Sequence, residues 1–96
     1  MLRDYEGTFI FRANLDDAGI ADEMGQVEEL IKAEGGTIKE WEKWGKRRLA
    51  YEIKGEHEGY YAFLTFQAEP ASIEKLVDAY RLRENLLRNM NIVLEG

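Results

Sequence analysis

The most hydrophobic strand-like segment of this chain reads Tyr60-Tyr61-Ala62-Phe63-Leu64-Thr65-Phe66-Gln67. Alternate residues of a strand point to opposite faces of a sheet. The even-numbered residues from 60 to 66 therefore share one face, and Tyr61 and Phe63 share the other. A strand with apolar residues on both faces is expected inside a sheet rather than at its edge. The segment is predicted to be a central strand.

Upstream of this segment, the sequence predicts one strand and one helix. Residues 5–12 alternate as a strand, with Phe9 and Phe11 on the same face. The helix that follows is predicted to end at Gly35-Gly36, because glycine suits a left-handed helix end. Its candidate N-terminal caps and apolar stripe are Asn14, Asp16, Asp17, Ile20, Met24, Val27, Leu30 and Ile31.

The remaining elements are two strands and a second helix. Residues 37–53 read as a long strand that is interrupted at Gly45, where a glycine indicates a bulge or a bend. Residues 55–59 read as a polar connection to the central strand. Pro70 suits the first turn of the second helix, because its missing donor would be unpaired there anyway. Residues 86–94 close the chain as a fourth strand.

The order of the elements is βαββαβ, which predicts an α+β fold of the ferredoxin-like type. In this topology a four-stranded antiparallel sheet carries both helices on one face. The first and third strands are central, and the second and fourth are edges. No linker or low-complexity segment interrupts residues 1–96, so a single domain is expected.

Charge is distributed unevenly along the chain, whose formal net charge is −6. Residues 13–36 carry seven acids and one lysine, and residues 55–80 carry five acids and one lysine. Residues 39–54 carry six cations and three acids, and residues 81–91 carry three arginines and one glutamate. The helical layer is therefore predicted to be acidic and the two edge strands basic.

Two explanations suit the basic edges. Edge strands often carry Lys and Arg because these residues prevent sheet-to-sheet pairing. The run Lys46-Arg47-Arg48 favours an external polyanion, because three adjacent cations repel one another and the folded chain alone gains little from them. Strand alternation sends Arg47 and Arg48 to opposite faces unless the bulge intervenes. One of the two is expected to serve the fold, through an intramolecular pair with a glutamate.

The composition argues against an enzyme. The chain has no cysteine, one histidine (His57) and one serine (Ser72), and these two lie in segments that are not expected to meet. His57 and its neighbours Glu56 and Glu58 occupy a polar turn, where adjacent side chains rarely converge on one metal ion. An acylphosphatase-type hydrolase would need a phosphate-cradling loop after the first strand, which is lacking. No catalytic residue, metal, cofactor or small-molecule substrate is predicted.

The chain also lacks signals for a membrane or for export. No apolar run approaches the roughly 20 residues that span a bilayer. The N-terminal residues run directly into a strand pattern and contain no apolar core of a signal peptide. A cytoplasmic protein without a membrane partner is expected.

Tyr61 and Phe63 are predicted on the open face of the sheet, away from the helices. Their strand partly matches the aromatic motif of an RNA recognition module, whose exposed rings stack bases at about 1–3 kcal/mol each. In place of that motif's basic residue and glycine, however, the chain has Gly59 and Tyr60. Strand parity also puts Phe11, the candidate partner ring, in the core. Base stacking and contact with a protein both remain open for Tyr61 and Phe63.

Two tryptophans, Trp41 and Trp44, lie three residues apart on the second strand. They fit packing at the sheet edge, over the bulge. They also fit a hydrophobic anchor in a partner interface, where tryptophan is enriched. The sequence leaves both alternatives open.

Taken together, four ordered motifs resemble a known family, the bacterial small-subunit ribosomal protein S6. The resemblance covers essentially the whole chain, and the basic motif on the bent second strand is the most specific. The motifs are Arg3-Asp4-Tyr5-Glu6, Gly45-Lys46-Arg47-Arg48-Leu49-Ala50-Tyr51, Glu58-Gly59-Tyr60-Tyr61 and Leu82-Arg83-Glu84-Asn85-Leu86-Leu87-Arg88.

The resemblance implies a structural, non-enzymatic component of the cytoplasmic ribosome. It implies binding to the small-subunit (16S) ribosomal RNA, as a heterodimer with the basic ribosomal protein S18. We expect Tyr61 and Phe63 to contact the partner protein. The alternative is a protein-interaction module that never touches RNA and whose cations pair with an acidic partner. The residues that we expect to bind RNA are Arg3, Lys46, Arg47, Arg48, Arg81, Arg83 and Arg88.

Three positions depart from the family pattern. Glu52 stands where the family often has proline, and Leu87 stands where a basic residue is common. The sequence stops at Gly96, so the C-terminal tail of many members is expected to be nearly absent. Contacts or modifications of that tail are therefore not transferred to this chain.

Overall fold

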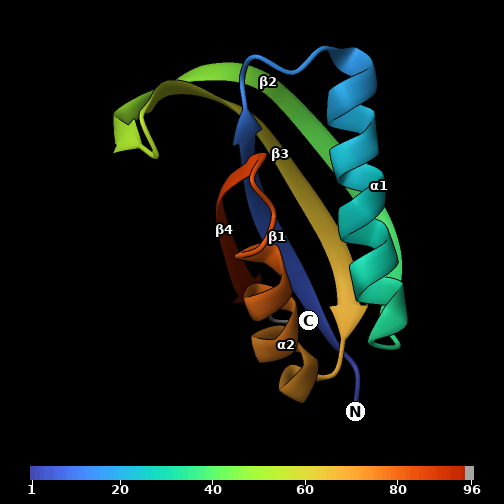
Figure 1. Ribbon diagram of the computed structural model, residues 1–96. Helices are drawn as coiled ribbons and strands as arrows, with labels where there is room; N and C mark the ends of the chain where they lie inside the picture. Colours follow the sequence, from blue (N-terminus) through green and yellow to red (C-terminus); the bar gives the residue numbers. More distant parts are fainter. Residues whose placement is uncertain (95–96) are drawn as a thin grey trace.

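The computed structural model describes residues 1–94, which form one antiparallel sheet with both helices on one face (Figure 1). The strand order is β2-β3-β1-β4, so β1 and β3 are central and β2 and β4 are edges. This confirms the predicted ferredoxin-like fold. The elements are β1 (Arg3–Arg12), α1 (Asp17–Ala33), β2 (Thr37–Ile53), β3 (Glu56–Ala68), α2 (Pro70–Tyr80) and β4 (Leu86–Val93).

The ends of the helices follow the local signals of the sequence. Among the three candidate caps, Asp16 caps α1, since its Oδ1 accepts a hydrogen bond of 2.8 Å from the Gly19 N–H. The helix stops where Gly35 adopts a φ of +82° and the Gly36 N–H bonds back to the Ile31 carbonyl at 2.9 Å. Pro70 begins α2 as predicted.

The main core lies between the sheet and the helices and follows the predicted strand parity. Phe9 and Phe11 of β1 and Leu64 and Phe66 of β3 are fully buried there. The burial of Phe11 removes the first-strand ring that an RNA-stacking platform would need. Tyr80 of α2 meets the Phe9 ring edge-on, with 5.4 Å between the centroids.

A buried carboxylate joins α1 to the loop before β4. Glu23 is only 6% exposed, yet it faces the core side of α1. One of its oxygens accepts from Arg83 Nη2 at 2.9 Å, and the other accepts from Asn85 Nδ2 at 3.0 Å. The charge-assisted bonds compensate the burial of the Glu23 carboxylate, and they fix the loop against the helix.

The hairpin between β2 and β3 corrects one sequence prediction. The polar connection expected over residues 55–59 is wrong, because β3 already begins at Glu56, which pairs with Ile53 of β2. The turn consists only of Lys54 and Gly55, with φ values of +50° and +81°. Two consecutive residues of positive φ are typical of the tight hairpin turn that matches strand twist. The polar residues 56–59 are strand residues paired with β2.

We predict that the Tyr80 hydroxyl weakens the fold at alkaline pH. This hydroxyl is buried and has no hydrogen-bond partner among residues 1–94. Burial raises the pKa of Tyr80 above its ordinary value of 10.0, so the folded chain keeps a proton that the unfolded chain loses. The free energy of unfolding is therefore unaffected by this group below pH 10. Above pH 10 it decreases, and at pH 11 the decrease is about 1.4 kcal/mol.

Urea unfolding at pH 9 and pH 11 checks this prediction. Tyr80→Phe should be at least as stable as the natural chain at pH 9, because the buried hydroxyl makes no bond. Its advantage should grow by about 1.4 kcal/mol at pH 11. An equal loss of stability in both chains between the two pH values would contradict the assignment.

Candidate nucleic-acid and partner-protein interface

The β2–β3 hairpin extends past the two helices and carries the basic run (Figure 1). We call residues 46–59 the hairpin lobe. The expected bulge at Gly45 is confirmed, because Gly45 has a φ of +81° and the pairing register shifts between Lys43 and Gly45. Of the two other register shifts between β2 and β3, one lies within the lobe and separates the Arg48–Glu58 pair from the Ile53–Glu56 pair. The bulge at Gly45 and this shift bend β2 across the open face of the sheet.

A second, smaller core holds the hairpin lobe on the open face. Ile10 of β1, Leu49 of β2 and Leu87 of β4 are buried together there. Gly59 lies beneath them, where a Cβ atom would overlap Ile10 Cγ2 and lie 3.3 Å from Leu49 Cδ2. From the sequence, Leu87 is notable only as an apolar residue where the family commonly has a basic one. Its burial shows that the position contributes packing in this chain.

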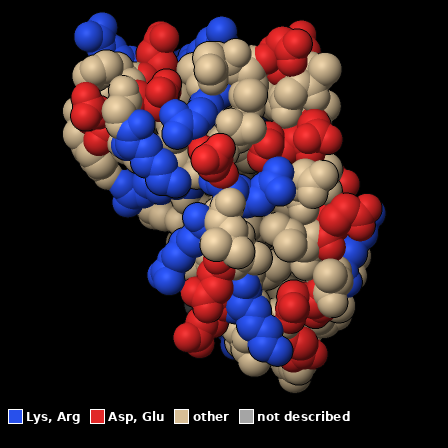
Figure 2. All heavy atoms as spheres, in the orientation of Figure 1, with Lys and Arg blue, Asp and Glu red and all other residues tan. Residues whose placement is uncertain are grey.

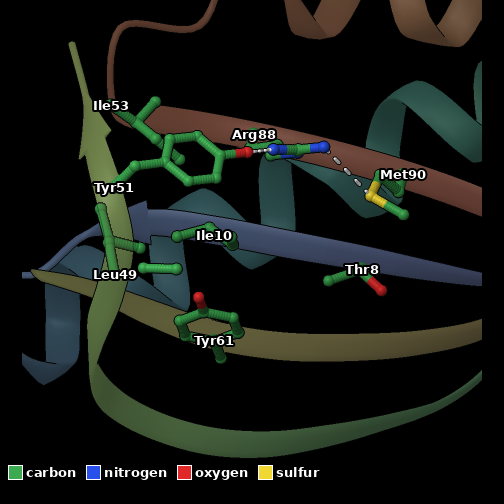
Figure 3. A pocket seen from close by; sticks show the side chains of 9 residues that line it. Thr8, Ile10, Leu49, Tyr51, Ile53, Tyr61, Arg88 and Met90 are labelled. Carbon is green, nitrogen blue, oxygen red and sulfur yellow. Dashed lines mark hydrogen bonds between the residues drawn. The ribbon is translucent and has the colours of Figure 1, made fainter.

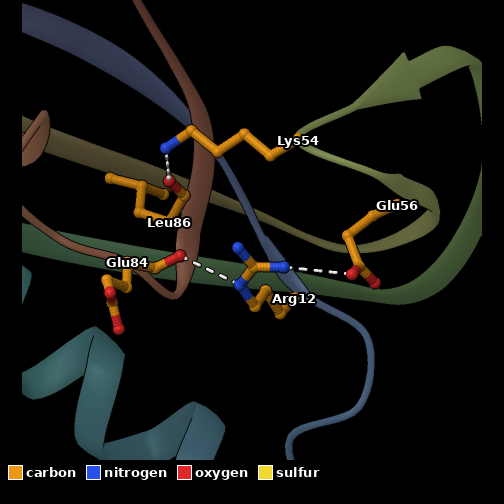
Figure 4. A network of polar contacts seen from close by, with 5 residues as sticks. All are labelled: Arg12, Lys54, Glu56, Glu84 and Leu86. Atoms are coloured by element: carbon orange, nitrogen blue, oxygen red, sulfur yellow. Dashed lines mark hydrogen bonds and ion pairs between the residues drawn. The ribbon is translucent and has the colours of Figure 1, made fainter.

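Two hydrogen bonds tie the tip of the lobe to β1 and β4 (Figure 4). Arg12 of β1 donates from Nη1 to Glu56 Oε2 and from Nε to the Glu84 carbonyl, each at 3.0 Å. Lys54 Nζ, at the tip, donates to the Leu86 carbonyl at 3.3 Å. These residues were not predicted as functional, because no local pattern shows that the turn reaches β4. The lobe is therefore a positioned element rather than a free hairpin.

An apolar pocket of about 220 Å³ opens on the sheet face between the lobe and β4 (Figure 3). Arg88 crosses its rim, donating from Nη1 to the Tyr51 hydroxyl and from Nη2 to Met90 Sδ at 3.6 Å. Half of the Met90 surface remains exposed. The pocket can accept an apolar group of a partner. Its apolar lining includes Ile10, Leu49, Tyr51, Ile53, Tyr61 and Met90.

The two predicted partner contacts both lie on this open face. Tyr61 lines the apolar pocket. Phe63 packs under Trp44, with ring centroids 4.8 Å apart, and Trp44 remains 50% exposed. Trp41, in contrast, packs on the main core and donates to Glu28 Oε2 at 2.6 Å. Each of the two alternatives for the tryptophans therefore suits one residue. Trp41 packs at the sheet edge, and Trp44 has an exposed surface that a partner can contact.

The cations of the lobe are not neutralised by the fold. Arg47 pairs in register with Gly59 and Arg48 with Glu58, so the two arginines point to opposite faces, as alternation predicts. Within residues 1–94, Lys46, Arg47 and Arg48 form no ion pair. The expected pair of one arginine with a glutamate is therefore wrong. Arg47 instead lies over the Trp44 ring, 5.7 Å from its centroid.

The other predicted RNA contacts have different surroundings. Arg3 forms no ion pair within the described part of the chain, while Arg81 pairs with the exposed Asp78 at 3.2 Å. Such an exposed pair is weak and leaves the arginine accessible. Arg83 is engaged with buried Glu23, and Arg88 with Tyr51. The RNA contacts of all these residues stay predictions.

Basic and acidic side chains both lie on the face of the molecule seen in Figure 2. Basic side chains gather around the indentation between the hairpin lobe and the body of the molecule, with some acids among them (Figure 2).

Among residues 1–94, no three His, Asp or Glu side chains gather as a metal site. Neither helix in this range has the length and apolar character needed to cross a lipid bilayer.

Comparison with known proteins agrees with this arrangement. The family model of ribosomal protein S6 matches residues 4–93. The chain belongs to the ribosomal protein S6 family. Small ribosomal subunit protein bS6 of Clostridium botulinum is 35% identical over 98% of this chain and 100% of the relative. The corresponding protein of Clostridium kluyveri is 37% identical over 90% of each chain.

Structural comparison supports the same assignment. A crystal structure of 30S ribosomal protein S6 from Thermotoga maritima has a TM-score of 0.88 at 27% identity, covering 98% of this chain and 89% of that one. The resemblance stated from the four motifs is thereby confirmed. The chain is a ribosomal protein of the small subunit, and its family works in the cytoplasmic ribosome.

Gly59→Ala should destabilise this S6-family chain by about 1–3 kcal/mol, because the added methyl group overpacks Ile10 and Leu49. Gly25→Ala is the matched control. Nothing lies within 4 Å of a Cβ at Gly25, which is inside α1, so alanine should stabilise the helix there by about 0.5–1 kcal/mol. Urea denaturation measures both changes. Equal stabilities of the two variants would show that the lobe is not held by this contact.

Proposed function

We propose that this chain is a structural, non-catalytic subunit that binds small-subunit (16S) ribosomal RNA together with ribosomal protein S18. The observation that carries the proposal is the unneutralised run Lys46-Arg47-Arg48 on a hairpin lobe that is held in place. Because the backbone of the lobe is already held, little backbone entropy is lost on binding, and release of counterions from RNA then favours the complex. Membership of the S6 family supports this role.

The open sheet face supports the partner contact. Its apolar pocket is lined by the exposed Tyr51 and the half-exposed Met90, and Trp44, packed on Phe63, is half exposed as well. Exposed aromatic and methionine side chains beside an apolar pocket are typical of protein interfaces. Neither the pocket nor these side chains suit a phosphate backbone. We assign this face to S18 and the cations of the lobe to RNA.

A protein-interaction module that binds no RNA is the second candidate, and the same apolar face favours it. Sedimentation of cell extracts separates the two functions. Recovery of this chain in the small ribosomal subunit supports RNA-bound assembly. Recovery only in fractions of free protein, and never with ribosomal subunits, would favour the second candidate.

Replacing Arg47 and Arg48 with alanine together should weaken binding to small-subunit RNA in the presence of S18. Each lost phosphate contact should reduce the slope of log affinity against log salt by about 0.7–0.9. The measurement is filter binding over a series of salt concentrations. Lys32→Ala with Lys75→Ala removes the same charge from the helices and should leave the slope unchanged. An unchanged slope in the arginine variant would refute the phosphate role.

Met90→Asp should weaken S18 binding about tenfold or more, because the new carboxylate is desolvated beside the apolar pocket. Leu82→Asp is the matched control, since Leu82 is 85% exposed and does not line the pocket. Isothermal titration calorimetry with purified S18 measures both. Equal affinities of the two variants for S18 would show that S18 does not bind at this face.

A further inference from the structure

A second, basic pocket lies at the free edge of β4, between that strand, the end of α2 and the tip of the hairpin lobe. Its volume is about 460 Å³. Three cations line it, and no carboxylate does. The cations are Lys54, Arg81 and Arg88; Asn89 adds an amide, and Val77 and Leu86 are among the apolar walls.

Lys54 occupies an unusual backbone position at the mouth of this pocket. Its φ of +50° makes it the sole non-glycine residue with a positive φ within residues 1–94. Glycine and asparagine suit such a turn position, and lysine does not. The long side chain nevertheless reaches the Leu86 carbonyl at 3.3 Å, on the edge strand (Figure 4). The chain therefore keeps a disfavoured residue where its amino group meets the pocket.

The charge in this pocket is largely uncompensated. Within residues 1–94, Lys54 has no carboxylate within ion-pair distance. Arg88 bonds the Tyr51 hydroxyl and the Met90 sulfur, and neither group is anionic. Only Arg81 has an acidic partner, the exposed Asp78. Apolar walls beside these cations weaken screening by water, so an anion entering the pocket is attracted more strongly.

We propose that this pocket binds a backbone phosphate of the RNA, with Lys54 as a phosphate contact that the family motifs do not include. The inference rests on the proposed RNA-binding function and names one site of that function. A phosphate supplies the acceptor oxygens that an ammonium and a guanidinium can bind together. Lys54 would turn its amino group from the neutral Leu86 carbonyl to the phosphate, while Arg88 remains fixed by Tyr51.

Lys54→Asn tests the proposal: it removes the hydrogen bond to the Leu86 carbonyl, and this loss is offset because asparagine tolerates a positive φ better than lysine. The variant should be as stable as the natural chain or more stable in urea. Its affinity for small-subunit RNA with S18 should fall, and its salt slope should decrease by about 0.7–0.9. Lys54→Arg should preserve the slope, and Lys32→Asn, on the acidic α1, is the matched control.

The outcomes separate this inference from the function on which it rests. In one outcome, Lys54→Asn keeps the salt slope of the natural chain while the Arg47 and Arg48 double variant has a smaller slope. This result would refute phosphate binding in the pocket and would support RNA binding by the lobe. If neither variant changes the slope, both proposals fail. Titration with inorganic phosphate, followed by NMR, should shift the Asn89 signals in the natural chain and not in Lys54→Asn. Equal shifts in both chains would overturn the site.

Discussion

The position of the hairpin lobe depends on the close packing of Ile10, Leu49 and Leu87 over Gly59. The β2–β3 hairpin extends beyond the helices, so the main core does not hold its tip. A two-stranded hairpin is marginally stable alone, and this second core supplies the tertiary contact that it lacks. The space left by the missing side chain of Gly59 lets Ile10 approach. Without this contact the basic run would sit on a mobile arm.

The position of the lobe also bears on the proposed binding of RNA by an acidic protein. The acids are concentrated on the helices, and Glu23 of α1, which reaches the loop before β4, is bound by Arg83 and Asn85. The cations of the lobe remain unpaired within residues 1–94. Local charge rather than net charge therefore decides which surface meets phosphate, and the acidic layer disfavours binding in the opposite orientation. The apolar open face is left for a protein.

The fold was readable from the sequence because its signals are local. Strand parity placed Phe9 and Phe11 in the core, and the bulge at Gly45 followed from one glycine. The contacts of the candidate site could be predicted only in part from the sequence. Glu23 and Arg83 lie 60 residues apart, so no local pattern shows that Arg83 is engaged. The contact of Lys54 with β4 likewise depends on the bend of the hairpin. The expectation that the C-terminal tail is nearly absent cannot be compared with the structure, because residues 95–96 lie outside the described residues.

Amide hydrogen exchange of this chain, in complex with S18 and with and without small-subunit RNA, tests the central claim most directly. The claim is that a positioned basic lobe and the start of β4 form the RNA surface. RNA should slow exchange in residues 46–58 and 81–89 and leave the acidic α1 at its rate in the S18 complex. Protection of α1 with unchanged exchange in the lobe would contradict the account.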